Sequence, residues 1–228
     1  MVQRFNITLG QQTMKKMHRL FMVFLMPLLA FSITACAEKY TEGEHYTKVS
    51  ETASKNAEVR EYFSFYCPHC LRFEPFMESV KKNLPEGVKF ERNHVDFLRA
   101  ASPEVQSMLS KAVVAAEQLG MESKLVGAIF NYLQIQRAVI TSEKDIRNIF
   151  VLNGADGEKF DKLMKSFSVN SHAKSMKKHQ DTMSKSGALK SVPTVIVNNK
   201  YRINTQALDK TNFEQDYKDL INYLLTLK

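Results

Sequence analysis

The sequence Cys67-Pro68-His69-Cys70 lies where a predicted strand meets a predicted helix, and this junction constrains the fold more than any other feature. The apolar run at residues 59–66 is typical of a buried strand, and residues 71–83 are typical of a helix. Two cysteines at i and i+3 of a first helical turn share one face and lie close enough to form a disulfide. The unpaired N–H groups and the dipole at a helix start favour negative charge, so we expect the thiolate of Cys67 to be stabilised. The motif therefore predicts a redox-active pair.

A structural disulfide and a metal site are the other uses open to such a pair. A closed zinc site needs four ligands, whereas the sequence has three cysteines and no second Cys-x-x-Cys to complete one. His69 lies between the two cysteines and could not join them in a comfortable geometry. We therefore expect no metal and no organic cofactor.

The first 37 residues have the features of an export signal. A basic stretch at residues 14–19 precedes an apolar run at residues 20–32, which is too short to span a bilayer comfortably. Ala35-Cys36-Ala37 then has the small-x-small pattern of a signal-peptidase site. Translation could begin at Met1 or at Met14, because residues 1–13 add nothing that a signal needs. Export would place the mature protein in an oxidising compartment, where disulfides persist.

The same leader leaves two alternatives open. The apolar run could stay in place as an N-terminal membrane anchor. Residues 33–36 also form a loose lipoprotein box, in which Cys36 would become the lipidated first residue. Cleavage after Ala37 would instead leave Cys67 and Cys70 as the two cysteines of the mature protein.

The order of predicted elements indicates a mixed sheet that a helical block interrupts. Residues 38–56 suggest an extended arm with at most a short strand, and residues 88–97 alternate as a second strand. Residues from about 100 to 186 show helical periodicity, with one helix expected at 156–167 and another at 171–186. A hairpin around Asn198-Asn199 and a last helix at 212–227 follow. Because the two halves of the sheet must meet, we expect Val192-Pro193 near the end of the first strand.

These features together resemble the DsbA family of periplasmic thiol:disulfide oxidoreductases. The resemblance depends on Cys-Pro-His-Cys after the strand 61–66 (EYFSFY) and on Val192-Pro193-Thr194 ahead of the hairpin. It covers the chain from about Glu38 to the C-terminus and implies an α/β thioredoxin fold with an all-helical insertion. We accordingly expect a signal peptide at 1–37, a thioredoxin-like domain at 38–99 and 181–228, and the insertion at 100–180.

The resemblance implies a role for each residue of the motif. Cys67 is the exposed nucleophile, Cys70 is the resolving thiol, and the two form the redox disulfide. Pro68 and His69 tune the pair, because an imidazole N–H near Cys67 stabilises the thiolate and so the reduced form. A disulfide whose reduced form is stabilised is a strong oxidant, a relation for which this family is the standard example.

Four further residues are implied by position. Pro193 is cis in the family, which would leave the backbone of Val192 free to pair with an extended substrate. Glu61 matches a buried acid beneath the active site, and Arg92 stands where the family often has a lysine that pairs with this acid. Because arginine does not release a proton at working pH, a role of Glu61 in proton relay stays open.

The function that follows is a periplasmic oxidase that introduces disulfide bonds into exported proteins. Its partners would be unfolded or reduced exported proteins, with reoxidation by a DsbB-like membrane quinone reductase, and the enzyme would be a monomer. A reductase or isomerase with the same fold, a non-catalytic binding module, and a lipid-anchored oxidase with narrower clients are the alternatives. The net charge is +8, but the leader supplies four of these charges, and no basic stripe interleaved with aromatic residues indicates nucleic-acid binding.

Overall fold

The computed structural model describes residues 39–227, so the predictions about the leader, its start at Met1 or Met14 and lipidation of Cys36 lie outside these residues. The strands are β1 (Tyr46–Lys48), β2 (Glu58–Phe63), β3 (Lys89–His94), β4 (Thr194–Val197) and β5 (Tyr201–Ile203). The helices are α2 (Pro68–Lys82), α3 (Pro103–Gln118), α4 (Glu122–Phe130), α5 (Glu143–Leu152), α6 (Gly157–Lys165), α7 (Phe167–Lys185) and α8 (Phe213–Thr226). A π-helical turn, η1 (Asn131–Ile135), follows α4, and a 3-10 turn, η2 (Thr205–Ala207), precedes α8.

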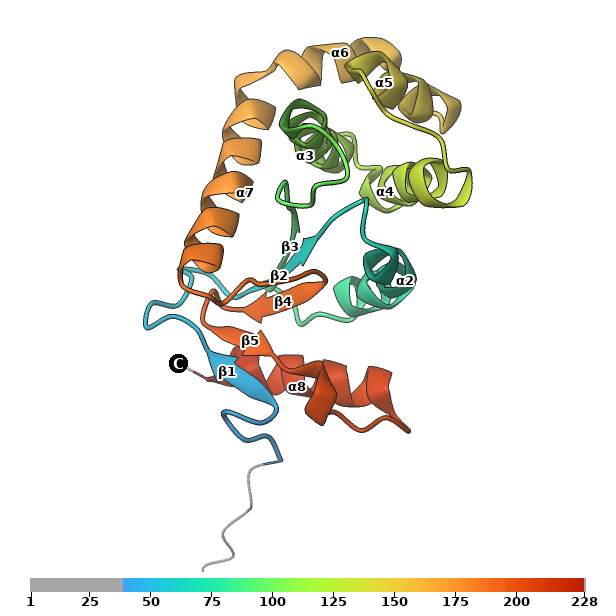
Figure 1. The fold of residues 1–228 in the computed structure, drawn as a ribbon. Coiled ribbons are helices and arrows are strands. Elements are labelled where there is room, and N and C mark those ends of the chain that lie inside the picture. The colour runs from blue at the N-terminus through green and yellow to red at the C-terminus, as the bar shows by residue number, and fades with distance from the viewer. Residues whose placement is uncertain (1–38, 228) are drawn as a thin grey trace, which may run out of the picture. The chain divides into compact units, whose positions relative to one another are not determined.

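The five strands form one mixed sheet in the order β1-β5-β4-β2-β3 (Figure 1). β2 pairs in parallel with β3 and antiparallel with β4, so the hairpin returns beside the first long strand as predicted. Asn198 and Asn199 have φ angles of 52° and 55°. Two successive left-handed residues make the type I′ turn that a tight hairpin prefers, which explains the Asn-Asn pair. The short β1 lies within the segment predicted as an extended arm.

Helices cover both faces of this sheet. Val59 of β2 packs in a core with residues of α2 and α8. Tyr62 packs in a separate core that includes Met183 of α7. Side chains of a strand alternate between faces, so neighbouring residues of β2 contribute to different cores. In Figure 1 the helices α3 to α6 gather above the sheet, and α7 leads from them back to β4. No helix within residues 39–227 has both the length and the apolar character needed to cross a membrane.

The helical block between β3 and β4 has its own core, which reaches the cysteine motif. Phe63 and Phe65 at the end of β2 pack in this core together with Cys67 and Cys70. The predicted boundary between the last two helices of the block is wrong: Ser166 ends α6, and its hydroxyl accepts a hydrogen bond from the Val169 N–H at 3.2 Å, so α7 begins at Phe167. A serine in extended conformation is a preferred N-cap residue. The prediction of one helix over residues 156–167 did not take this property of Ser166 into account.

The strand before the motif is shorter than predicted. β2 ends at Phe63, because Ser64 begins a turn: its hydroxyl accepts from the Tyr66 N–H at 3.2 Å and its carbonyl from the Cys67 N–H at 3.0 Å. The helix starts at Pro68, so Cys67 and Cys70 lie at its first turn as predicted, and it continues through Pro75. The turn places Cys67 at the N-terminus of α2.

Candidate active site

Cys67 is the N-cap residue of α2. Its backbone is extended, with φ −96° and ψ 113°, and its sulfur accepts a hydrogen bond from the Cys70 N–H at 3.2 Å. Pro68 occupies the first helical position, where the missing N–H costs nothing. The sulfur thus takes the place that a serine or aspartate oxygen usually has at a helix start. The sulfur therefore lies at the positive end of the helix dipole.

The two sulfurs are both largely covered. Cys67 is 5% exposed and Cys70 is 1% exposed, and the structure holds them as free thiols. The expectation of an exposed nucleophile is therefore wrong, because the cap position places Cys67 against the core of the helical block. Burial, together with the hydrogen bond to Cys67, raises the pKa of the Cys70 thiol well above its ordinary value. The Cys70 thiol is therefore held in its protonated form.

The loop before β4 lies against the motif. The Val192-Pro193 peptide bond is cis, and the Cys67 thiol donates to the Val192 carbonyl at 3.4 Å. Tertiary packing thus brings together residues far apart in the sequence. A groove of about 1130 Å³ begins here, bounded by His69, Val192 and Pro193 at one end and by the start of α8 at the other.

His69 is exposed beside Cys67 and has a partner that the sequence interpretation missed. The Arg72 guanidinium donates to Nδ1 of His69 at 2.8 Å. Because arginine has no acceptor, Nδ1 must be unprotonated, which leaves the proton on Nε2. In this arrangement the positive charge next to the motif belongs to Arg72. The i, i+3 spacing on one helix face is the signal that could have found it.

Glu61 and Arg92 face each other across the β2–β3 ladder, but their side chains do not pair. In the described residues, 39–227, no hydrogen bond or ion pair joins Glu61 to Arg92. The Arg92 guanidinium, 1% exposed, instead forms ion pairs with Glu74 at 2.8 Å, with Glu122 at 3.3 Å and with Glu78. The guanidinium thus contacts acids of α2 and α4, while its charge acts on Glu61 through space without a direct ion pair within residues 39–227.

Glu61 is left buried without a hydrogen bond to its Oε2 atom. Burial raises the pKa of Glu61 to about 8, and the nearby positive charge of Arg92 offsets only part of this effect. The charge of Glu61 also contributes to the raised pKa of Cys70. The buried acid beneath the motif is thus held mainly in its neutral form near pH 7.

Replacing Glu61 with glutamine should remove a pH-dependent loss of stability. The folded state binds the Glu61 proton more tightly than the unfolded state, whose pKa is 4.5. This contribution is complete below the unfolded pKa and is lost as the pH rises through the folded value of about 8. From about pH 5 to pH 9, the unfolding free energy of the wild type should fall relative to E61Q by up to roughly 4 kcal/mol. Urea unfolding of the reduced proteins measures this difference.

The exposed Glu86 supplies the control. Glu86→Gln makes the same chemical change in a solvated turn and should follow the wild-type profile. An E61Q profile that runs parallel to the wild type would show that burial of Glu61 does not shift its proton affinity.

Gln134 is a second residue that sequence reasoning missed. It lies in the π-helical turn η1, and its side-chain amide donates to the Phe65 carbonyl at 2.7 Å and the Cys67 carbonyl at 3.1 Å. One side chain of the helical block therefore holds the backbone on both sides of Tyr66. Irregular helical turns of this kind are frequent near functional sites. The contact spans two distant parts of the chain, so no local sequence pattern predicts it.

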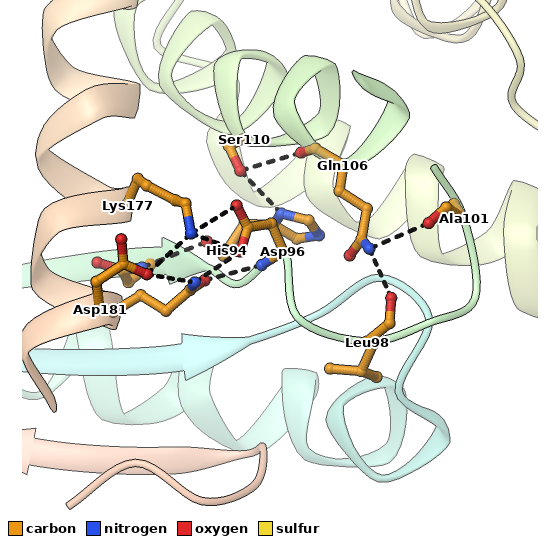
Figure 2. Close-up of polar contacts among 10 residues, drawn as sticks. His94, Asp96, Leu98, Ala101, Gln106, Ser110, Lys177 and Asp181 are labelled. Atoms are coloured by element: carbon orange, nitrogen blue, oxygen red, sulfur yellow. Dashed lines mark hydrogen bonds and ion pairs between the residues drawn. The ribbon is translucent and has the colours of Figure 1, made fainter. Parts of the chain in front are cut away.

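A buried polar network lies behind the motif (Figure 2). His94 stacks on Phe65, with ring centroids 5.2 Å apart, and its Nδ1 is 3.0 Å from the Ser110 hydroxyl. Gln106 donates to the Leu98 carbonyl at 2.5 Å and accepts from Ser110 through its backbone carbonyl at 3.1 Å. Burial lowers the pKa of His94 to about 3, so the ring is neutral. The network joins β3 and the loop after it to α3, which supports the floor beneath Cys67.

Comparisons with known proteins place this site in a family. The family model described as DSBA-like thioredoxin domain matches residues 58–218. The thiol:disulfide interchange protein DsbA of Escherichia coli K12 is 36% identical over 214 residues, covering 91% of this chain and 98% of that protein. The DsbA of Pectobacterium carotovorum is 36% identical over 218 residues, covering 93% of this chain and 100% of that protein.

Solved structures agree with the sequence comparisons. A variant of DsbA from Proteus mirabilis, in complex with the non-covalently bound peptide PWATCDS, superposes with a TM-score of 0.72 at 30% identity, covering 82% of this chain and 99% of that chain. DsbA from Klebsiella pneumoniae superposes with a TM-score of 0.71 at 25% identity, covering 84% and 100%. The predicted thioredoxin fold with a helical insertion is confirmed. The chain belongs to the family of DSBA-like thioredoxin domains.

Proposed function

We propose that this protein forms disulfide bonds in exported proteins by exchanging its Cys67–Cys70 disulfide for two client thiols. A client thiolate attacks the Cys67 sulfur, and Cys70 leaves and takes up a proton. A second client thiolate then attacks the client sulfur of the mixed disulfide and releases Cys67 as a thiolate. The client loses two electrons and this protein gains them. The relatives named thiol:disulfide interchange protein support this activity.

One observation supports the direction of exchange most strongly: the Cys67 sulfur caps the N-terminus of α2. The sulfur that is released in the last step is the one the helix terminus stabilises as a thiolate. Stabilisation of the reduced form makes the disulfide a stronger oxidant. Cys70, buried and held as a thiol, suits the resolving role that returns the disulfide.

The groove beside Val192 is the proposed place for the client. An extended client segment would pair with the Val192 backbone, as in the addition of a strand to a sheet edge. The peptide-bound DsbA structure from Proteus mirabilis supports peptide binding by this family. We assign tuning roles to Pro68 and His69, and to Glu61 and Arg92 beneath the motif.

The proposed setting is the periplasm, reached through a signal peptide at residues 1–37. Reoxidation would come from a DsbB-like membrane quinone reductase, and the enzyme would act as a monomer. The proposed domain limits are 38–99 and 181–228 for the thioredoxin-like domain and 100–180 for the insertion, whose last helix continues to Lys185. The name DsbA, which the curated relatives share, supports this setting.

The equilibrium of the Cys67–Cys70 pair with a glutathione redox buffer tests the proposal. We expect glutathione to reduce the disulfide readily, and the ultraviolet absorbance of the thiolate to show that Cys67 is ionised at neutral pH. The Cys67→Ser variant lacks the cysteine pair and supplies the baseline for the thiolate absorbance. A disulfide that resists glutathione would contradict the oxidase assignment and indicate a reductase or a structural bridge.

A further inference from the structure

The groove that starts at the cysteine motif combines an apolar floor with a charged rim. Phe73 of α2, Ile203 of β5 and Phe213 of α8 supply apolar surface along it. The loop with Val192 and Pro193 forms the end nearest to Cys67. The lining residues come largely from α2, β4, β5, α8 and the loops beside them, elements that Figure 1 labels. An extended segment placed here would run from the motif toward the start of α8.

The charges around this groove have one dominant sign. Its lining includes four cationic side chains, and Glu44 is the one carboxylate among the lining residues that the structure describes. The four cations are Arg72, Lys190, Arg202 and Lys210. Within residues 39–227, none of these four forms an ion pair with a carboxylate. The positive charge of the groove is therefore not neutralised by the protein itself.

Arg202 is held in place without a counter-charge. It is half-buried in β5, and its guanidinium donates to the Ala188 carbonyl at 3.1 Å and to the Thr47 hydroxyl at 3.4 Å. Both acceptors are neutral, so they orient the side chain and leave its charge uncompensated. An arginine fixed in this way presents a permanent positive charge to the groove.

Some cations elsewhere in the described part of the chain lie beside acids. Lys89 pairs with Glu91, Arg147 pairs with Asp161 at 2.9 Å, and Lys177 bridges Asp96 and Asp181 at 3.2 and 2.8 Å. These pairs show that the chain supplies acids beside cations on its other surfaces. Other exposed lysines, such as Lys144 and Lys159, also take part in none of the ion pairs within residues 39–227. The groove is distinguished because four cations and a single carboxylate line one surface.

We propose that the groove favours client segments that carry acidic side chains next to the cysteine to be oxidised. Arg72, beside His69, and Lys190, two residues before Val192, would face client residues that flank the bound cysteine. Lys210 and Arg202 would attract acids farther along the segment. Complementary charge of this kind speeds encounter and orients the partner more than it strengthens the final complex, and salt weakens it. This inference rests on the proposed function, because it concerns the choice among its clients.

Three matched dithiol peptides test the inference. They share one sequence with two cysteines and differ only in the residues flanking the first cysteine, which are Asp, Asn or Lys. Stopped-flow measurement of their oxidation by the disulfide form of the full chain gives the second-order rate constant at low and at high salt. We expect the Asp peptide to be oxidised about tenfold faster than the Lys peptide at low ionic strength, with the ratio falling toward one at high salt.

Charge-reversed variants locate the effect. Lys190→Glu with Lys210→Glu changes two exposed groove residues and should lower the Asp-to-Lys ratio to one or below. Lys144→Glu with Lys159→Glu makes the same change in charge on exposed first turns of α5 and α6, away from the groove lining, and should keep the wild-type ratio.

The outcomes separate the two claims. Equal rates for all three peptides would overturn the charge preference and leave the oxidase function standing. A ratio that drops equally in both double variants would also overturn it, because net charge rather than the groove would be responsible. Failure to oxidise any peptide would overturn the proposed function and, with it, the preference.

Discussion

Replacing Cys67 with serine should abolish disulfide exchange and leave the fold intact. Removal of Cys70 should abolish oxidation of client thiols, because no disulfide can form, but should leave a Cys67 thiol that still attacks a client disulfide. Serine is a preferred N-cap residue, so it can accept the Cys70 N–H that the Cys67 sulfur now accepts. The remaining thiol in C67S is buried, and its pKa is raised by that burial. At pH 7 its reaction with iodoacetamide should be at least about a hundredfold slower than that of Cys67 in C70A.

The comparison of C67S with C70A decides which cysteine attacks. C70A should accumulate a covalent complex with a client peptide disulfide, seen by mass spectrometry: Cys67 attacks one client sulfur, the other leaves as a thiolate, and this protein has no second thiol to complete the exchange. Circular dichroism and urea unfolding check that both variants fold. Faster alkylation of C67S than of C70A would reverse the assignment of the two roles.

Replacing Arg92 with methionine should destabilise the reduced protein by about 3–5 kcal/mol. The guanidinium is buried and neutralises Glu74 and Glu78 of α2 and Glu122 of α4. Without it, acids packed beneath the motif lose their counter-charge, and burial has already raised the pKa of Glu74. Urea unfolding should show a loss that shrinks in mild acid, where Glu74, whose pKa is raised, takes up a proton.

Two variants make this test specific. Arg147→Met removes a half-exposed arginine from its pair with Asp161 and should cost no more than about 1 kcal/mol. Arg92→Lys keeps the charge but cannot reach three carboxylates at once, so its stability should lie between the wild type and R92M. Equal losses for R92M and R147M would show that the buried cluster adds nothing beyond a surface pair.

Particular residues show how far sequence reasoning reached. Pro68 and the cysteine before it form a helix start whose requirements are local, so the position of Cys67 at the terminus of α2 was predictable. Asn198 and Asn199 adopt the left-handed conformations that a tight hairpin needs, and the turn was predicted from the same two letters. The end of β2 was predicted three residues too late, because Ser64 accepts two backbone N–H groups and breaks an otherwise apolar run.

The errors and omissions at the site concern long side chains and burial. Arg92 lies opposite Glu61 in the strand register yet pairs with acids from two helices, and Gln134 of the π-helical turn η1 donates to the Cys67 carbonyl. The near-complete cover of Cys67 likewise depends on that block. None of these contacts joins residues close in sequence. Each depends on which side chains become neighbours when the elements pack.

The sequence alone determined the order of elements, the redox pair at a helix start and the return of the hairpin to the first strand. These follow from local rules: strand alternation, helix capping and turn chemistry act over a few residues. The tertiary structure decided which acids surround Arg92, that Glu61 stays neutral, and that four unpaired cations line one groove. Electrostatic interactions and burial act through space, so their outcome is settled only when α2, α4, β5 and α8 have packed around the motif.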